Sequence, residues 1–114
     1  MDNQEIIIRV ANSGDTHYSE TITNEMEQSA KARGTGIAKR SPEYIANKMT
    51  EGKAVIALLK DGTWVGFCYI ETWSHGAFVA NSGLIVSPAF RKSGVAKQIK
   101  ERIFKLSRQL FPES

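Results

Sequence analysis

The residues best suited to chemistry lie in one stretch, residues 84–96, which reads LIVSPAFRKSGVA. An apolar strand ends at Pro88, and a short turn with Arg91, Lys92 and Gly94 then opens an amphipathic helix. The first amides of a helix lack internal partners, and the helix dipole adds positive charge at that end. Gly94 has no Cβ to keep a bulky anion away, and the two cations would neutralise it. The stretch therefore predicts a cradle for a phosphate or pyrophosphate group.

The positive charge of the chain is concentrated beside this cradle. The 114 residues include 15 Lys and Arg against 12 Asp and Glu, a net charge of +3. Residues 91–114 hold 7 basic and 2 acidic side chains, whereas residues 1–90 hold 8 and 10. This asymmetry favours an anionic partner, such as nucleic acid, a phosphorylated cofactor or an acidic substrate. A solvated helix face that binds no ligand is the alternative.

Length and composition indicate one domain, residues 1–114. With 41% hydrophobic residues, the chain can bury a core of its own. Cys68 is the single cysteine, so no internal disulfide forms, and a free thiol suits a reducing compartment. No apolar run approaches the roughly 20 residues that span a bilayer, and the N-terminus resembles neither a signal nor a transit peptide. We expect a cytoplasmic protein with no membrane partner and no metal site.

The order of elements predicts an α+β sandwich, a mainly antiparallel sheet flanked by helices. The first strand is nearly all apolar, which favours an interior position in the sheet. Asp15 is expected to cap the first helix, Ser41 and Pro42 to begin the second, and Asp61-Gly62 to join two strands in a hairpin. The expected elements are a strand at 5–11, helices at 15–31 and 42–50, strands at 53–60, 63–73 and 77–86, and a helix from 93 to 111.

The stretch at 84–96 resembles the central motif of the GNAT family of N-acetyltransferases. That motif is an apolar strand reading L-x-V-x-P, two further residues, then R/Q-x-x-G-x-G/A and a helix. The expected order of elements also matches the family from its first strand to its third helix, so the resemblance covers essentially the whole chain. The matching residues are Leu84, Val86, Pro88, Arg91, Gly94 and Ala96.

The resemblance implies an acetyl-CoA-dependent N-acetyltransferase that transfers an acetyl group directly to a primary amine in a ternary complex. In the family, the strand before the loop pairs with the pantetheine arm, a role that falls here to Ile85 and Val86. The backbone amides of the loop bind the pyrophosphate. In this chain the loop residues are Arg91, Lys92, Ser93, Gly94, Val95 and Ala96.

Direct transfer needs a deprotonated amine, and therefore a base, but no protein nucleophile. Glu71, near a strand end, and His75, in the following turn, are the candidate catalytic residues, with Asn81 and Ser82 also near the expected cleft. For Glu71 and His75 the alternative is a solvent-exposed position without a role. For Cys68, flanked by aromatic residues in a strand, we expect a buried side chain.

The acceptor is a small-molecule amine in this interpretation. Family members commonly wall the acceptor site with the loop between the first two helices, and here that loop carries Arg33 and Arg40. These cations would pair with a carboxylate, which favours an amino acid, unless they are simply solvated. The segment SAKARGTGIAKRSPEYI also resembles a bacterial subgroup linked with arginine biosynthesis, which makes glutamate a candidate acceptor.

The chain departs from the family after its last helix, where family domains usually continue with further strands and a helix. We expect residues 1–114 to be a C-terminally incomplete domain whose open sheet edge makes it a homodimer or a strand-exchanged oligomer. A catalytically incomplete module that binds acyl-CoA or a protein partner is the alternative function. Nucleic-acid binding is disfavoured, because the last helix shows no aromatic platform and no recognition motif.

Overall fold

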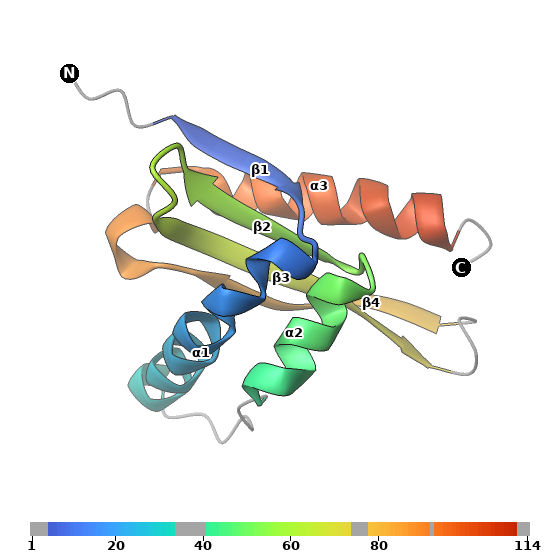
Figure 1. Cartoon of the computed structure of the whole chain (residues 1–114), viewed down its shortest axis with the longest axis horizontal. Coiled ribbons are helices and arrows are strands. Elements are labelled where there is room, and N and C mark those ends of the chain that lie inside the picture. Colours follow the sequence, from blue (N-terminus) through green and yellow to red (C-terminus); the bar gives the residue numbers. More distant parts are fainter. Residues whose placement is uncertain (1–4, 34–40, 74–77, 92, 112–114) are drawn as a thin grey trace.

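A computed structural model describes residues 5–33, 41–73, 78–91 and 93–111 of the chain. Two helices cover one face of a four-stranded sheet and a third covers the other, so the described residues form three layers (Figure 1). This confirms the expected α+β sandwich. The elements are β1 (Ile6–Val10), the 3-10 helix η1 (Ser13–Tyr18), α1 (Ser19–Arg33), α2 (Pro42–Thr50), β2 (Ala54–Leu59), β3 (Trp64–Trp73), β4 (Phe78–Val86), the 3-10 helix η3 (Pro88–Phe90) and α3 (Val95–Leu110).

The sheet is an antiparallel meander in the order β1-β2-β3-β4. The hairpin predicted at Asp61-Gly62 and the further strand predicted at 77–86 are confirmed. The interior position predicted for the first strand is wrong, because β1 forms one edge of the sheet and Ile7 is 40% exposed. An apolar run reports burial of many side chains, but it does not report whether a strand has one neighbour or two.

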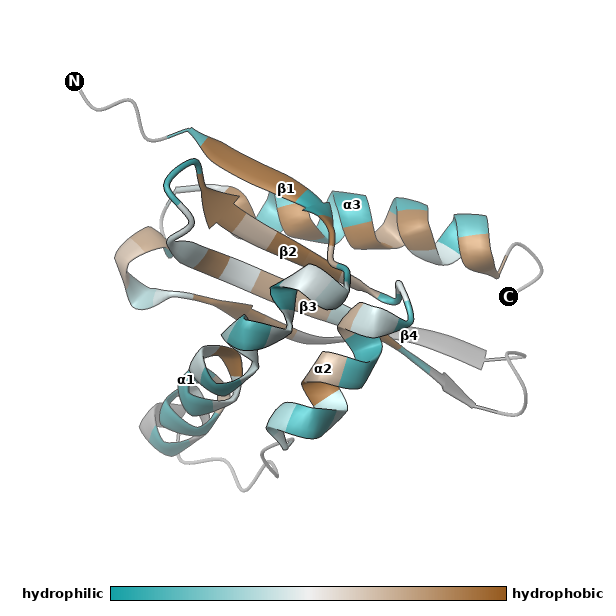
Figure 2. Ribbon diagram, viewed as in Figure 1, coloured by the Kyte–Doolittle hydropathy of each residue, from teal (hydrophilic) through white to brown (hydrophobic). Residues whose placement is uncertain are grey.

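Alternating side chains on the strands divide the core between the two faces of the sheet. In β2, Ile56 and Leu58 pack towards α1 and α2, whereas Val55 and Ala57 pack towards α3. All six residues of β2 are buried, which explains its unbroken hydrophobic sequence. Figure 2 shows the same division, with hydrophobic strands between a largely hydrophilic α1 and an α3 of mixed character.

Helix α3 packs closely against Gly66 of β3. A Cβ on Gly66 would lie 2.6 Å from Cδ1 of Ile99 and 3.2 Å from the carbonyl oxygen of Ile85. The pairing of β2 with β3 shifts register between Ala57 and Leu58, so β3 has one extra residue there. Only glycine leaves room for the fully buried Ile99 side chain at this point. The glycine therefore sets the depth at which α3 lies on the sheet.

The helix starts show one confirmed prediction and one error. Ser41 caps α2 by accepting a hydrogen bond from the amide of Tyr44, and Pro42 is the first helical residue, as expected. The cap predicted at Asp15 is wrong, because Asn12 caps the preceding η1 and accepts from the amide of Gly14. Asp15 is instead the third residue of η1, 3% exposed, and its carboxylate accepts from Arg9 and from the Asn12 amide.

Candidate cofactor-binding site

The turn between β4 and α3 leaves open space in front of Gly94. Gly94 has φ +84, a left-handed conformation that favours glycine. No atom of the described structure lies within 4 Å of a Cβ built on this residue, apart from its chain neighbours. The conformation of this residue therefore favours glycine, and, as a separate feature, the space beside its backbone is free. This free space is what a bulky ligand requires.

The first turn of α3 offers backbone amides and carries no compensating acid. The amide of Gln98 donates to the carbonyl of Gly94 at 3.4 Å, which closes the first turn. The three helical amides before Gln98 have no acceptor within the helix. Glu20 and Glu43 stand in the first turns of α1 and α2, whereas the fully described first turn of α3 has no acidic side chain. The positive end of its dipole is thus available to an anion.

Two of the loop amides predicted to hold pyrophosphate are already engaged. The Arg91 amide donates to the Pro88 carbonyl at 3.5 Å, and the Ser93 amide donates to the Phe90 carbonyl at 3.2 Å. The Ser93 hydroxyl also donates to the Phe90 carbonyl, at 2.6 Å. These bonds form a tight turn that points the chain into α3. The anion-binding capacity therefore concentrates at Gly94 and the residues after it.

Strand β4 is an edge of the described sheet, and Val86 presents its backbone to that edge. The Ser87 amide donates to the Val65 carbonyl of the β3 strand at 2.8 Å. Because successive residues of a strand direct their backbone groups to opposite sides, those of Val86 face away from β3 and those of Ile85 face towards it. Of the two residues predicted to pair with a pantetheine arm, Val86 has the orientation that the role requires.

The Arg91 side chain connects this loop to α1. Its Nε donates to the carbonyl of Val86 at 3.2 Å, and its Nη2 donates to Glu25 Oε2 at 2.8 Å and to Ser29 Oγ at 3.1 Å. Glu25 and Ser29 are one helical turn apart on α1, so they share a face. Neither residue belongs to a motif that the sequence shows. Their spacing of four residues is visible in the sequence, but the sequence does not show that this face of α1 lies against Arg91.

Glu71 lies on the face of the sheet covered by α2, where the hydroxyl of Tyr44 donates to its carboxylate with an Oη–Oε1 distance of 2.7 Å. The Tyr44 ring meets the Tyr69 ring edge-on at a centroid distance of 5.7 Å. Lys48 Nζ lies 5.6 Å from the centre of the Tyr44 ring. A carboxylate, two aromatic rings and a cation are therefore brought together by α2 and β3. Glu71 is a candidate base from the sequence, and the structure adds Tyr44 as its partner.

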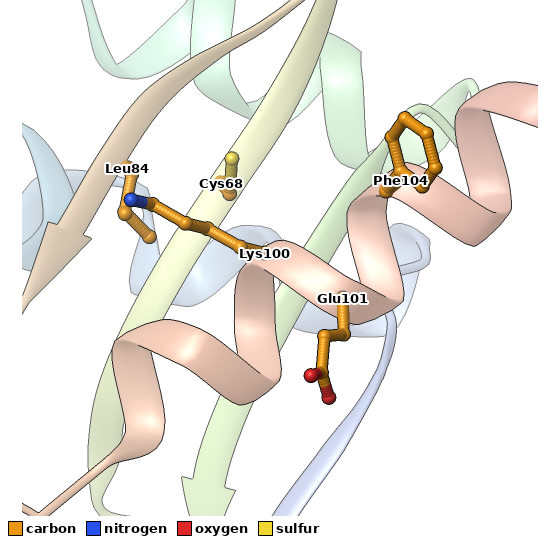
Figure 3. A pocket seen from close by; sticks show the side chains of 5 residues that line it. All are labelled: Cys68, Leu84, Lys100, Glu101 and Phe104. Atoms are coloured by element: carbon orange, nitrogen blue, oxygen red, sulfur yellow. The ribbon is translucent and has the colours of Figure 1, made fainter.

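The opposite face of the sheet holds a pocket of about 400 Å³ beside α3 (Figure 3). Its walls are Cys68, Leu84, Lys100, Glu101 and Phe104. Burial raises the pKa of the Cys68 thiol to about 12, and the side chain is 1% exposed. The thiol is therefore protonated at neutral pH and is no candidate nucleophile. The expectation of a buried Cys68 is confirmed.

Several predicted site residues lie outside the described residues. His75, Lys92 and Arg40 are among them, and Arg33 ends α1 with a side chain that the structure does not describe. Within the described ranges, no group of three or more His, Cys, Asp and Glu side chains could hold a metal ion. No helix in those same ranges is long and apolar enough to cross a membrane.

Comparison with solved structures places the fold among acetyltransferases. The chain is similar to an N-acetylglutamate synthase from Neisseria gonorrhoeae, solved with coenzyme A and N-acetyl-glutamate, with a TM-score of 0.70 and 22% identity over 95% of this chain and 24% of that one. It is also similar to the diaminobutyrate acetyltransferase of Paenibacillus lautus, solved with L-2,4-diaminobutyric acid and coenzyme A, with a TM-score of 0.69 and 15% identity over 89% of this chain and 57% of that one.

A GNAT acetyltransferase from Listeria monocytogenes gives a TM-score of 0.72 and 17% identity, over 94% of this chain and 72% of that one. The chain thus spans about a quarter of the synthase and little more than half of the diaminobutyrate enzyme. No curated protein matches it in sequence. The family model described as "Acetyltransferase (GNAT) family" matches residues 24–111, from within α1 to the end of α3. The chain therefore belongs to the GNAT family of acetyltransferases.

Proposed function

We propose that this chain binds acetyl-CoA at the start of α3 and serves the transfer of an acetyl group to the primary amine of a small molecule. The observation that carries the proposal is the open space at Gly94, in a left-handed turn that leads into the positive end of α3. Coenzyme A carries a pyrophosphate, which such a helix start suits. The complexes of the synthase and the diaminobutyrate enzyme with coenzyme A support the same assignment.

The backbone of Val86 would hold the pantetheine arm at the open edge of β4. Its N–H and C=O face away from β3, and an extended arm with amide groups can pair with them as a further strand does. The Val86 carbonyl already accepts from Arg91 Nε at 3.2 Å, so this oxygen is shared with the loop. The arm and the pyrophosphate would then lie on consecutive segments of the same chain. The bound donor would supply a thioester to be attacked by the amine.

Glu71 would accept the proton that the attacking amine loses, directly or through a water molecule. Its carboxylate is half-buried and held by the Tyr44 hydroxyl, which leaves other lone pairs of both oxygens for a further donor. A base of this kind contributes about 10²- to 10⁴-fold to the rate of transfer. His75 is the second candidate for the same role.

An amino acid is the acceptor class that we propose, with glutamate as a specific candidate. Two structural neighbours were solved with such molecules bound, one with N-acetyl-glutamate and the other with L-2,4-diaminobutyric acid. In this chain, Arg33 and Arg40 would pair with the acceptor carboxylate, at the end of α1 and in the segment before α2. The proposed setting is the cytoplasm.

Self-association is a further part of the proposal. β4 is an edge strand, and Phe104 beside the pocket of Figure 3 is 55% exposed. An edge strand with apolar surface next to it can pair with a second copy. We expect a homodimer or a strand-exchanged oligomer, and light scattering at micromolar concentration tests it. A monomer would contradict this part without affecting the cofactor assignment.

The experiment for the catalytic proposal is release of free thiol from acetyl-CoA in the presence of a panel of amino acids and polyamines. We expect release with at least one amino acid, and a fall of about 10²-fold or more for Glu71→Gln. Unchanged release by Glu71→Gln would remove this residue from the role of base. If wild type binds coenzyme A but releases no thiol with any amine, the chain is a binding module.

A further inference from the structure

One ion pair ties α1 to the turn between β4 and α3. Arg91 Nη2 lies 2.8 Å from Glu25 Oε2 and 3.1 Å from Ser29 Oγ, although 66 and 62 residues separate them in sequence. Its Nε donates to Val86 at 3.2 Å, so the guanidinium bridges α1 and the end of β4. Three acceptors from two segments hold one side chain in a single orientation. The Arg91 guanidinium is therefore held by the fold, unlike a surface cation that contacts only water.

The bridge is weak enough to be displaced. The Arg91 side chain is 48% exposed, whereas that of Glu25 is 16% exposed. Ion pairs with an exposed partner contribute little free energy, because water screens the charges and both side chains lose conformational freedom. A guanidinium binds phosphate in the same forked geometry as carboxylate, and the pyrophosphate of coenzyme A carries two negative charges against one on the carboxylate. A phosphate at the cradle would therefore compete effectively with Glu25.

Glu25 also places a negative charge beside a site that suits anions. Arg91 lies three residues before Gly94, where the space in front of the backbone is open. The half-exposed Arg91 is neutralised by a carboxylate that is itself mostly withdrawn from water. This arrangement lowers the affinity of the cradle for anions, since Arg91 is occupied and Glu25 repels them.

We propose that Glu25 competes with the phosphates of the cofactor for Arg91, so that cofactor binding detaches the guanidinium from α1. Glu25 is thus a positioning residue that acts through Arg91 and sets cofactor affinity. The inference rests on the proposed function, because it takes the turn before α3 as the phosphate site.

Calorimetric titration of the 114-residue chain with coenzyme A, and separately with inorganic pyrophosphate, tests the proposal. Glu25→Gln keeps a hydrogen-bond acceptor but removes the charge, and we expect coenzyme A to bind about two- to fivefold tighter. Inorganic pyrophosphate should also bind more tightly to Glu25→Gln than to wild type. Ser29→Ala, which removes one uncharged acceptor, should give a smaller gain and serves if Glu25→Gln does not fold. A residue with a purely structural role would not tighten binding when replaced.

Glu27→Gln is the matched control, since it removes the same charge from the same helix, where Glu27 lies 4.0 Å from Lys31. We expect the affinity of this variant to stay within about 1.5-fold of wild type. In an Arg91→Gln background, the gain from Glu25→Gln should shrink to that of the control. Equal affinities of Glu25→Gln and Glu27→Gln would overturn the inference and leave the proposed function standing. Absence of coenzyme A binding by wild type would instead overturn the proposed function, and the competition with it.

Discussion

Tyr44 and Glu71 are joined across the interface between α2 and the sheet, the tyrosine hydroxyl donating to the carboxylate with an Oη–Oε1 distance of 2.7 Å. The pair is 27 residues apart in sequence and fixes the first turn of α2 against the far half of β3. Because this bond is made between two side chains of the fold itself, it sets the orientation of the carboxylate. The proposed base is therefore held by the same contact that docks α2.

Replacing Tyr44 tests this docking contact. Tyr44→Phe keeps the ring that meets Tyr69 but removes the hydroxyl, so we expect the free energy of unfolding to fall by about 1 kcal/mol. Urea titration monitored by circular dichroism measures the change. Glu71→Gln, which still offers an oxygen acceptor to the hydroxyl, should cost less. A stability equal to wild type for Tyr44→Phe would show that the bond contributes nothing to docking α2.

The ion pair of Arg9 and Asp15 predicts a dependence of stability on pH. Two hydrogen bonds of 2.8 Å from Arg9 hold the pKa of the Asp15 carboxyl below its ordinary value, with a further bond from the Asn12 amide. A lowered pKa in the folded state contributes stability above the unfolded pKa of about 4, and this is lost as pH falls through the folded pKa. We expect Asp15→Asn to lose about 2 kcal/mol at pH 7 in urea titrations and much less at pH 2.

Glu5→Gln is the control for the pH experiment, because Glu5 and its partner Lys60 are both exposed at a separation of 4.0 Å. We expect its stability to follow wild type at both pH values. If Asp15→Asn behaves in the same way as this control, the buried carboxylate is not a source of acid sensitivity.

A side chain at Gly66 should clash with Ile99, and a smaller residue at position 99 should relieve the clash. In Gly66→Ala the new methyl would lie 2.6 Å from Cδ1 of Ile99, and we expect a loss of about 1–3 kcal/mol from overpacking. Ile99→Val removes that Cδ1 atom and costs about 1 kcal/mol alone. The double variant should be more stable than the sum of the two losses predicts, as a thermal or urea double-mutant cycle measures. Strict additivity would mean that the methyl is accommodated elsewhere.

The buried Cys68 thiol should react slowly with thiol reagents in the native chain. With a pKa raised to about 12, its thiolate fraction at pH 8 is about 10³-fold below that of an ordinary cysteine. Reaction with a colorimetric disulfide reagent should therefore be slower by at least that factor in the native chain, and reach normal rates in urea. Rapid labelling of the native protein would show that the pocket beside Lys100 opens to solvent.

Much of the architecture follows from local sequence. Ser41 and Pro42 predict the start of α2 at the observed residue, because a cap and a first-turn proline act locally. The Asp15 cap was predicted wrongly since Asn12 lies three residues earlier and competes for the same role. The edge position of β1 depends on its number of neighbours, which a hydrophobic pattern does not report.

The candidate site likewise has a part that local sequence predicts and a part that depends on contacts between distant segments. Gly94 and the residues around it were predicted from a motif that is continuous in sequence, and the structure describes Gly94 in an open left-handed turn. The contacts of Glu25 with Arg91 and of Tyr44 with Glu71 join distant segments. Their existence depends on how α1 and α2 are oriented on the sheet, which neither helix encodes by itself.

The most direct test of the cofactor assignment compares two glycines in the same conformation. Gly94 has φ +84 and Gly52, after α2, has φ +72, and neither has an atom within 4 Å of a built Cβ other than its chain neighbours. Gly94→Glu and Gly52→Glu therefore introduce similar backbone strain and the same charge at two places. Calorimetric titration with coenzyme A should show binding by wild type and by Gly52→Glu, and none by Gly94→Glu. Equal affinity of the two variants, or no binding by wild type, would contradict a cofactor site at the start of α3.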